Sequence, residues 1–462
     1  MSKSNFIAFP IKKDPACYLK WSWSTVYLNK GTTASCHRTM HLPLTVENFG
    51  EFHNLPKKID DRERMLRGEW PQETPEHDGW NSGLSGCNYC QYIESAGGRS
   101  DRIHQTETQR ELPFFQSIPP ELIDDPTATR VSPTILEVYF SNTCNMSCLY
   151  CGPHFSSQWY EENRRFNMME EDGVMVNPSW RPLHVDYFGL RDELFKWLEQ
   201  NSRSLWNFGM LGGEPFVQDE FEMMLDHFDQ YPNPDLMFTM TTNLKIPFEK
   251  LVKHVERIKR MCSEGKMKHF NISASMDCGD DATMEYVRWG LNMEKWRKNF
   301  KYLVQQDDWL ILNLNFTITP LTIKSLDKLL EQINEWDHQR AVNRLGENGA
   351  KDLLNKHEDY GKHLTFSFMH CVEPAQLDPT YWDPEVFRED FERILKVIPQ
   401  RTQYQKSMRD YMEGIWRKIQ QQPVVPEKIL LLKTYLNEID RRRNLNWKET
   451  FPWLEEVFKQ YA

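Results

Sequence analysis

Three cysteines lie in the stretch Ser141-Asn-Thr-Cys-Asn-Met-Ser-Cys-Leu-Tyr-Cys-Gly152, where Cys144, Cys148 and Cys151 have a C-x3-C-x2-C spacing. The residues just before it, 135–140, are mostly β-branched or aromatic, a pattern that predicts a strand. The three thiols are therefore expected on a loop at the carboxyl end of a strand, where α/β folds place their chemistry.

The ligand chemistry of this loop leaves two kinds of site open. Thiolates are soft ligands that suit iron–sulfur clusters or zinc. A cubane cluster normally takes four cysteines, and the next cysteine after Cys151 is Cys262, so one iron would stay open to a ligand from outside the protein. The alternative is a structural zinc site, which needs four ligands and could take His154 as the fourth.

The composition excludes several classes of protein. The chain has 462 residues and a formal charge of -11, which disfavours binding along a phosphate backbone, so no nucleic acid partner is expected. The N-terminus lacks the charged-then-apolar pattern of a signal peptide, and no apolar run approaches the ~20 residues of a membrane helix. We expect a cytoplasmic protein without a membrane partner. Its ten cysteines then favour metal or cluster sites over disulfides.

The N-terminal residues contain a second group of cysteines. Residues 21–28 alternate like a strand, Asn29-Lys-Gly31 predicts a turn, and residues 32–36 predict the returning strand of a hairpin. Cys17 and Cys36 bracket this hairpin, and Cys87 and Cys90 follow in a C-x2-C pair. These four thiols could complete one site for an iron–sulfur cluster or for zinc.

Strands and amphipathic helices alternate after a proline-rich linker at 108–132. The alternation favours parallel βα units in a barrel-type or doubly wound sheet. Beyond Pro374 the pattern is helical, and we interpret the run Arg441-Arg442-Arg443 as a solvated helix face. The predicted strands are 135–140, 204–211, 236–241, 269–276, 309–318 and 364–370, and the predicted helices include 186–200, 219–231, 247–261 and 293–304.

These features together resemble the radical S-adenosylmethionine (SAM) enzymes, whose signature is C-x3-C-x-φ-C with an aromatic φ, here Tyr150. The resemblance implies a [4Fe–4S] cluster whose open iron is chelated by the amino and carboxylate groups of SAM. Reduction of SAM would yield a 5′-deoxyadenosyl radical that abstracts hydrogen from a substrate. The implied fold is α/β, a partial (β/α)6 TIM-like barrel over residues 133–374 with a helical C-terminal extension at 375–462.

The resemblance also implies residues that contact SAM. Gly-Gly-Glu lets a backbone approach a ligand closely, although Gly-Gly alone more often forms a turn. In relatives a serine and an arginine hold the SAM carboxylate, which suits the planar guanidinium, whereas many arginines are simply exposed. Asp277 is expected to be a turn or cap. The positions that carry these roles over are Gly212, Gly213, Glu214, Asn243, Ser275 and Arg288.

The pattern Cys17-x13-Gly31-x4-Cys36 is similar to that of the SPASM and twitch domains of this family. It implies that residues 1–107 form a twitch-like domain with an auxiliary [4Fe–4S] cluster on Cys17, Cys36, Cys87 and Cys90, and a small helical insert between 48 and 80. Twitch domains usually follow the barrel, whereas this one precedes it. The domain order is therefore permuted, which folds tolerate when termini lie close together.

The predicted function is that of a radical SAM enzyme acting on a peptide or protein, with a flavodoxin- or ferredoxin-type reductant. The alternatives are oxidation of a small molecule such as an aminosugar, and a non-catalytic metal-bearing redox or binding module. No catalytic residue beyond the cofactor contacts is assigned. Among other polar positions, Asn313 and Asn315 could meet the adenosine or bond within the barrel, and His370 and Cys371 lie near its mouth. Cys262 and Cys278 are interpreted as structural.

Overall fold

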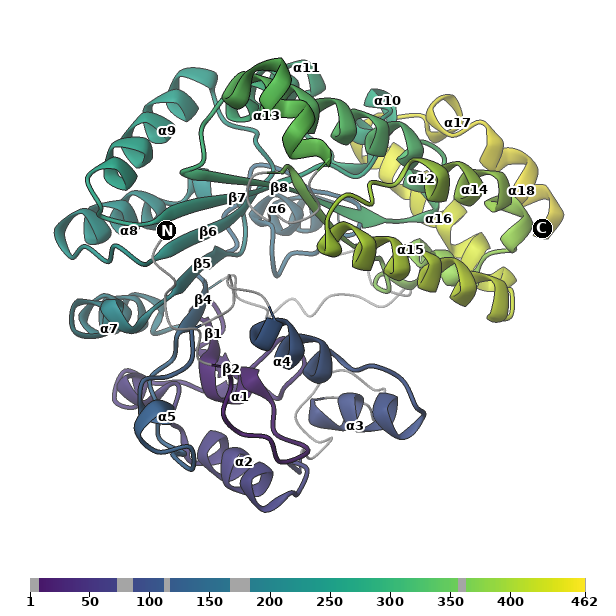
Figure 1. The fold of residues 1–462 in the computed structure, drawn as a ribbon. Helices are drawn as coiled ribbons and strands as arrows, with labels where there is room; N and C mark the ends of the chain where they lie inside the picture. Colours follow the sequence, from purple (N-terminus) through teal and green to yellow (C-terminus); the bar gives the residue numbers. More distant parts are fainter. Residues whose placement is uncertain (1–7, 73–85, 112–116, 167–182, 356–362, 462) are drawn as a thin grey trace.

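The computed structural model describes residues 8–72, 86–111, 117–166, 183–355 and 363–461 (Figure 1). The first seven residues, the last part of the predicted helical insert and residues 112–116 of the predicted linker lie outside these ranges. Among the described residues, no helix is both long enough and apolar enough to cross a membrane.

The fold is mixed α/β and is built on one nine-stranded sheet in the order β3-β2-β1-β4-β5-β6-β7-β8-β9. The six predicted strands are confirmed as β4–β9, and each pairs in parallel with the next along the chain. Closure of this sheet into a partial barrel stays a prediction. The strands are β1 (Trp23–Tyr27), β2 (Thr32–Ala34), β3 (Leu42–Pro43), β4 (Ile135–Tyr139), β5 (Asn207–Leu211), β6 (Met237–Thr242), β7 (His269–Ser275), β8 (Leu310–Ile318) and β9 (Thr365–His370).

Helices lie along one side of the sheet, and the N-terminal helices form a second group beyond β1 (Figure 1). The helices that follow β4–β8 are α6 (Ser157–Phe166), α7 (Tyr187–Asn201), α8 (Asp219–Gln230), α9 (Phe248–Ser263), α10 (Asp281–Val287), α11 (Met293–Val304), α12 (Pro320–Ile323) and α13 (Leu326–Asn355). The N-terminal helices are α1 (Tyr18–Ser22), α2 (Pro56–Arg67), α3 (Cys87–Ser95), α4 (Asp101–Glu111) and α5 (Glu121–Asp124). The C-terminal helices are α14 (Arg388–Val397), α15 (Gln403–Gln421), α16 (Pro426–Arg443), α17 (Trp447–Thr450) and α18 (Trp453–Tyr461).

The predicted N-terminal hairpin is present, but it belongs to the main sheet. β1 pairs antiparallel with β2, as predicted, and pairs in parallel with β4 on its other side, with Val26 opposite Val138. The phenol rings of Tyr27 and Tyr139 stack with centroids 4.6 Å apart. Because the two strands are parallel, the amino ends of β1 and β4 lie at the same edge of the sheet. The sequence did not predict this pairing.

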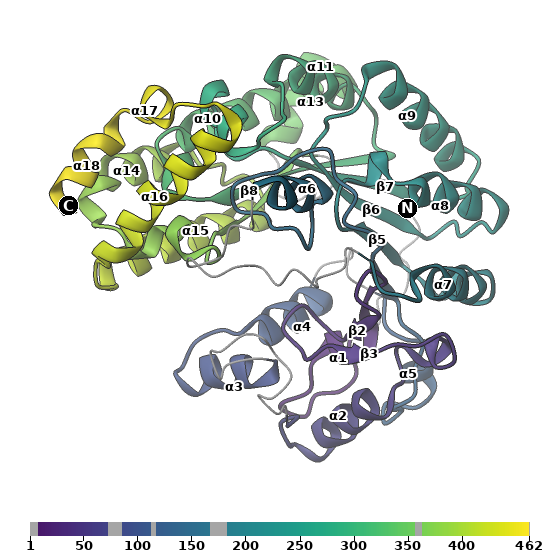
Figure 2. The ribbon, with the colours of Figure 1, turned by 180° about the vertical axis from the view of Figure 1, so that it is seen from behind.

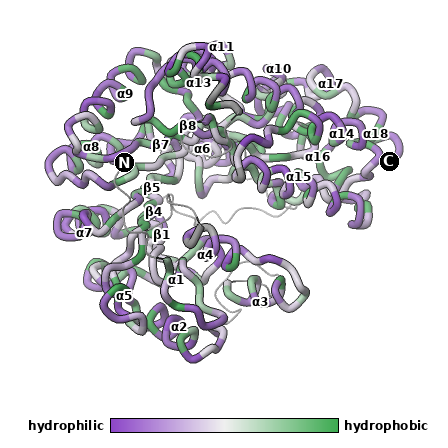
Figure 3. Tube along the Cα trace, in the orientation of Figure 1, coloured by the Kyte–Doolittle hydropathy of each residue, from purple (hydrophilic) through white to green (hydrophobic). Residues whose placement is uncertain are grey.

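The two faces of the sheet differ in polarity. The covered face carries the buried rings of Phe208, Phe238 and Phe270, and Phe221 and Phe228 of α8 pack edge-on against them. Along the chain the surrounding helices alternate between hydrophobic and hydrophilic residues, as amphipathic helices do (Figure 3). Burial of aromatic rings of this size supplies most of the favourable free energy that holds helix to sheet.

The opposite face is lined by polar side chains at alternate positions of the strands. A parallel strand that is covered on both faces is usually apolar throughout, so this alternation marks a face that is not packed by a hydrophobic layer. Asn313 donates to Ser273 Oγ (2.6 Å) and Ser367 Oγ (3.0 Å), and Asn207 donates to Thr239 Oγ1 (3.1 Å). The polar residues of this face include Glu137, Tyr139, Asn207, Thr239, Thr241, Asn271, Ser273, Ser275, Asn313, Asn315, Thr317 and Ser367.

Candidate functional site

The backbone of the cysteine loop, residues 141–152, is fixed by hydrogen bonds to the start of α6. Ser157 Oγ accepts from the amide of Cys144 and donates to its carbonyl, both at 3.1 Å. The carbonyl of Cys148 accepts from the amide of Cys151 at 3.0 Å and from the indole N–H of Trp159 at 2.7 Å. These bonds fix the main chain at all three cysteines. The three cysteines are partly buried and form no disulfide.

Burial disfavours the charged form of these thiols. It raises the pKa of Cys144 to about 12, with the neighbouring Cys148 acting in the same direction. Burial also raises the pKa of Cys148, and the guanidinium charges of Arg288 and Arg443 oppose that shift. Three thiolates held together in this way need a cationic partner such as iron, because a bound metal ion stabilises the deprotonated thiol.

Three soft donors on one short, anchored loop fit a cubane cluster. Among the described residues, no three His, Cys, Asp or Glu side chains are grouped so that they could hold a metal ion. A cubane differs from a single ion, since each of its cysteines bonds a different iron and the ligands lie correspondingly farther apart. The donor set therefore fits the cluster that the resemblance implies, with Cys144, Cys148 and Cys151 as its ligands.

Gly212 and Gly213, after β5, bring the chain directly against the cysteine loop. Gly213 has φ +55°, and a Cβ on it would lie 2.2 Å from the carbonyl oxygen of Thr143, so no side chain fits there. The next amide, of Glu214, donates to that same oxygen at 2.8 Å. The backbone that Gly213 approaches is thus that of Thr143, the residue before Cys144, and the close approach to a ligand that the sequence implied stays a prediction.

The buried carboxylate of Glu214 ties this turn to the end of β6. Its Oε1 accepts from Thr242 Oγ1 at 2.6 Å, and its Oε2 accepts from the amide of Asn243 at 2.7 Å. The side-chain amide of Asn243 in turn donates to Asn145 Oδ1 at 2.9 Å and lies 3.9 Å from Cys144 Sγ. Gly213, Glu214 and Asn243, predicted separately, are thus brought together beside the first cysteine.

Replacing Glu214 with glutamine is expected to change how stability depends on pH. Burial raises the pKa of this carboxyl to about 7, against the hydrogen bonds from Thr242, Asn243 and Phe216, which favour the charged form. Because the folded protein favours the protonated carboxyl, this group adds to the free energy of unfolding. The added stability is fully present below the ordinary pKa of 4.5 and is lost as the pH rises through about 7. The advantage of the wild type over Glu214→Gln should therefore be larger at about pH 5 than at about pH 8, as measured by urea unfolding of the metal-free protein.

The matched control for this prediction is Glu161→Gln, a substitution at an exposed carboxylate on α6. We expect this control to stay parallel to the wild type over the same pH range. A difference between wild type and Glu214→Gln that does not vary with pH would contradict the prediction.

Arg288 and Asp277 form a buried ion pair behind the cysteine loop. Arg288 Nε and Nη2 donate to the two oxygens of Asp277 at 2.7 and 2.8 Å, and the side chains are 7% and 0% exposed. Asp277 also accepts from the Tyr150 hydroxyl at 2.8 Å and from the Thr317 amide at 2.9 Å. The interpretation of Asp277 as a turn or cap was wrong, because its side chain pairs with α10 and β8, and Arg288 is not an exposed surface arginine.

Ser275 lies at the end of β7, where it pairs with Asn315 of β8. Its hydroxyl belongs to the polar face of the sheet. Tyr150 and Arg288 stand close together, with the guanidinium 5.4 Å from the ring centroid. The predicted contacts with SAM stay predictions. The sequence did contain a signal for the ion pair. It is a carboxylate, at the end of Ser273-Ala-Ser-Met-Asp277, that comes eleven residues before an arginine.

The C-terminal helix α16 contacts the cysteine loop, which the sequence did not predict. The Tyr435 hydroxyl donates to the carbonyl of Leu149 at 2.7 Å, and Arg443 Nη2 lies 3.3 Å from Ser147 Oγ. The run 441–443 is not a uniformly solvated face, because Arg442 and Arg443 are buried and only Arg441 is exposed. The interpretation failed because it considered charge without the face on which the helix packs.

The second group of cysteines lies at the opposite end of β1 from the cysteine loop. Cys17 directly precedes α1, and Cys36 follows β2, which is antiparallel to β1, so both are near the amino ends of β1 and β4. Burial raises the pKa of Cys17 to about 12, and the charges of Cys36 and Cys90 act in the same direction. Cys17 and Cys87 are buried in the same small core as Trp21. Cys17 therefore lies near Cys36 and Cys90 and shares a core with Cys87, and the role of the four as ligands stays a prediction.

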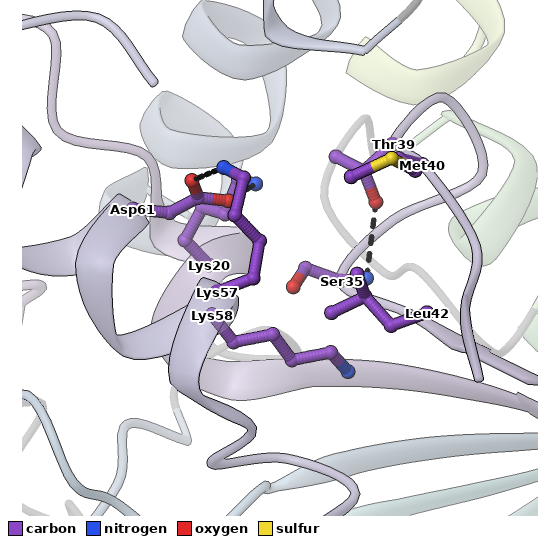
Figure 4. A pocket seen from close by; sticks show the side chains of 8 residues that line it. All are labelled: Lys20, Ser35, Thr39, Met40, Leu42, Lys57, Lys58 and Asp61. Atoms are coloured by element: carbon purple, nitrogen blue, oxygen red, sulfur yellow. Dashed lines mark hydrogen bonds and ion pairs between the residues drawn. The ribbon is translucent and has the colours of Figure 1, made fainter. Parts of the chain in front are cut away.

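Figure 4 shows a small pocket rich in lysine, one of whose lining residues, Thr39, accepts from the amide of Cys36 at 3.3 Å. Lys58 is buried and donates to Ser24 Oγ at 2.9 Å and Thr33 Oγ1 at 3.0 Å, and Lys20 pairs with Asp61 at 2.6 Å. Burial lowers the pKa of Lys58, and the charge of Cys36 opposes the shift. The pocket therefore contains lysines paired with Asp61 and a buried lysine whose charged form is disfavoured. It is lined by Lys20, Ser35, Thr39, Met40, Leu42, Lys57, Lys58 and Asp61.

The remaining candidates have contacts within the protein, and their contacts with a ligand stay predictions. Asn313 makes the hydrogen bonds within the sheet that were the alternative to a ligand contact. The thiol of Cys371 is buried and donates to the carbonyl of Glu373 at 3.0 Å, and His370 lies 3.4 Å from the ammonium of Lys418. Cys278 is fully buried and Cys262 is partly buried.

No protein-family model matches the chain, and no curated protein matches it. Among solved structures, the chain is similar to SuiB from Streptococcus suis, which was solved bound to the precursor peptide SuiA. The two share 12% sequence identity with a TM-score of 0.34, over 82% of this chain and 69% of the other. Likeness at this level supports no inference about site or substrate, so any inference about function must rest on the residues of this chain.

Proposed function

We propose that the chain is a radical SAM enzyme that binds a [4Fe–4S] cluster on Cys144, Cys148 and Cys151. The observation that carries the proposal is the anchored loop of three thiols, packed at Thr143 against a Gly-Gly-Glu turn. When bound, the cluster and SAM supply a 5′-deoxyadenosyl radical. The protein's part is to leave one iron open, to position SAM, and to keep water from the radical.

The residues divide this work among them. The Gly213–Glu214 turn offers backbone groups to the SAM amino group, while the Glu214 carboxylate holds the turn against β6. Asp277 takes two donors of Arg288 and thereby fixes the direction of the third guanidinium nitrogen. That nitrogen and Ser275 are our candidates for the SAM carboxylate. The polar face of the sheet, which Ser275 shares, is the surface on which a substrate meets the radical.

The substrate that we propose is a peptide or protein, and the electron comes from a flavodoxin- or ferredoxin-type reductant. Cys17, Cys36, Cys87 and Cys90 would hold an auxiliary cluster, which would supply electron-transfer chemistry there. The uncharged amides and hydroxyls of the polar face suit a substrate rich in peptide groups, since each can donate or accept a hydrogen bond. A mass shift on a co-encoded peptide after anaerobic incubation with SAM would identify such a substrate.

The experiment that tests the function is anaerobic reconstitution with iron and sulfide, followed by metal analysis and by reduction with dithionite in the presence of SAM. We expect iron and sulfide without stoichiometric zinc, and formation of 5′-deoxyadenosine. The metal-free protein is the control and should form none. Stoichiometric zinc in place of iron, or intact clusters that produce no 5′-deoxyadenosine and no methionine, would refute the proposal.

A further inference from the structure

Arg443 places a buried positive charge against the cysteine loop from the end of helix α16. Its side chain is only 2% exposed. Nε and Nη2 each lie 3.1 Å from Glu162 Oε2, and Nη2 lies 3.3 Å from Ser147 Oγ. Its Nη1 is buried and has no hydrogen-bond partner among the described residues. A guanidinium is always charged, so this orphaned donor needs an acceptor.

The ion pairs around Arg443 join α16 to α6, two helices that are labelled in Figure 2, and their charges do not balance. Glu438 pairs with Arg441 and Arg442, both on its own helix. The Glu162 carboxylate lies 3.1 Å from the guanidinium of Arg443 and 3.7 Å from that of Arg442. In these contacts three guanidiniums share two carboxylates, and Arg443 is the member of the group that reaches the cysteine loop.

The contacts of Arg443 converge on Cys148. Ser147 is the residue before this cysteine, and the indole of Trp159, 4.7 Å from the guanidinium, donates to the Cys148 carbonyl. Trp289, whose carbonyl accepts from the amide of Ser147, lies 5.8 Å from the same guanidinium. Two aromatic rings this close lower the local dielectric and strengthen the field of the charge at the thiolates.

We propose that Arg443 is the fixed counter-charge of the cluster on the cysteine loop and raises its reduction potential. The inference rests on the proposed function. Reduction adds one electron, supplied by dithionite or the physiological reductant, and therefore one negative charge to a group that three thiolates already make anionic. A nearby positive charge stabilises the reduced form more than the oxidised form, and burial and hydrogen bonding are the protein's means of tuning such potentials. The C-terminal extension is thus part of the redox site and not a separate appendage.

The test is a potentiometric titration of the reconstituted protein, followed by the electron paramagnetic resonance signal of the reduced core cluster in a Cys90→Ala background. Arg443→Met should shift the midpoint to more negative potential, while Arg443→Lys keeps the charge and should lie between Arg443→Met and the wild type. Arg442→Met is the matched control, because it removes a buried neighbouring charge that pairs with Glu438 at 2.8 Å and lies farther from Glu162, at 3.7 Å, and it should shift the midpoint less than Arg443→Met does.

Glu162→Gln provides a second readout of opposite sign, because it removes the carboxylate that offsets Arg443, and it should shift the midpoint to more positive potential. It decides the question if Arg443→Met does not fold. An unchanged midpoint in Arg443→Met with the cluster intact, equal shifts in Arg443→Met and Arg442→Met, or no shift in Glu162→Gln would each overturn the proposal. Failure of the wild type to assemble a core cluster would instead count against the proposed function.

Discussion

Cys148→Ala should abolish formation of 5′-deoxyadenosine and lower the iron content from about eight to about four atoms per chain. The thiol of Cys148 is one of three ligands on the loop, and two remaining cysteines cannot hold a cubane that already lacks a fourth protein ligand. The second group of cysteines does not depend on this loop and should keep its own cluster. Iron and sulfide analysis and chromatography of the SAM products after dithionite reduction measure both effects.

Two cysteine variants provide controls for this prediction. Cys262→Ala removes a partly buried thiol at the end of α9 and should retain full iron content and SAM cleavage. Cys90→Ala should also lose about four irons, yet keep SAM cleavage, because it disrupts only the second group. A Cys148→Ala protein that still cleaves SAM would show that the ligands of the core cluster are wrongly assigned.

Asp277→Ala should destabilise the metal-free protein by about 3–5 kcal/mol, because it leaves the guanidinium of Arg288 buried without its counter-ion. Both partners are buried and joined by two short hydrogen bonds, and Asp277 also accepts from Tyr150 and Thr317. Loss of this carboxylate therefore leaves hydrogen-bond donors without an acceptor in three places: Arg288 directly after α10, Thr317 of β8, and Tyr150 of the cysteine loop. Urea unfolding of wild type and variant measures the difference.

The control for this prediction is Asp281→Ala, which removes the exposed partner of Arg297 on the surface of α10. Exposed ion pairs are worth about 0–1 kcal/mol, so this variant should unfold close to the wild type. Equal effects of the two substitutions would mean that the Asp277–Arg288 pair does not hold α10 and β8 together.

The parallel core was predictable because its signals are local. Residues 269–276 and 309–318 each show a strand pattern, and the intervening residues 293–304 show the spacing of an amphipathic helix, which the structure has at Met293–Val304. The predicted strand at 204–211 begins instead at Asn207, because Ser202–Ser204 forms a 3-10 turn after α7. Errors of this size arise at element ends, where local propensity is weakest.

The parts of the site that form a motif of a few consecutive residues were predictable. The parts that depend on contacts between residues far apart in the sequence were not. The spacing of Cys144, Cys148 and Cys151 identified the loop, and Gly213 identified a close backbone approach. Arg443 meets Ser147 across 296 residues, and only the packing of α16 decides that two of three consecutive arginines turn inward. Buried ionic contacts of this kind follow from tertiary structure and leave no periodic pattern.

The pairing of β1 with β4 has a consequence for electron transfer. Both strands span five residues in register, so ~16 Å of hydrogen-bonded sheet separates their amino ends, near the second cysteine group, from their carboxyl ends, near the cysteine loop. The tunnelling distance between the two centres would then be a constant of the architecture, insensitive to substrate binding. If both cysteine groups bind clusters, hydrogen bonds between the strands, rather than the covalent linker, would set the spacing of the redox pair.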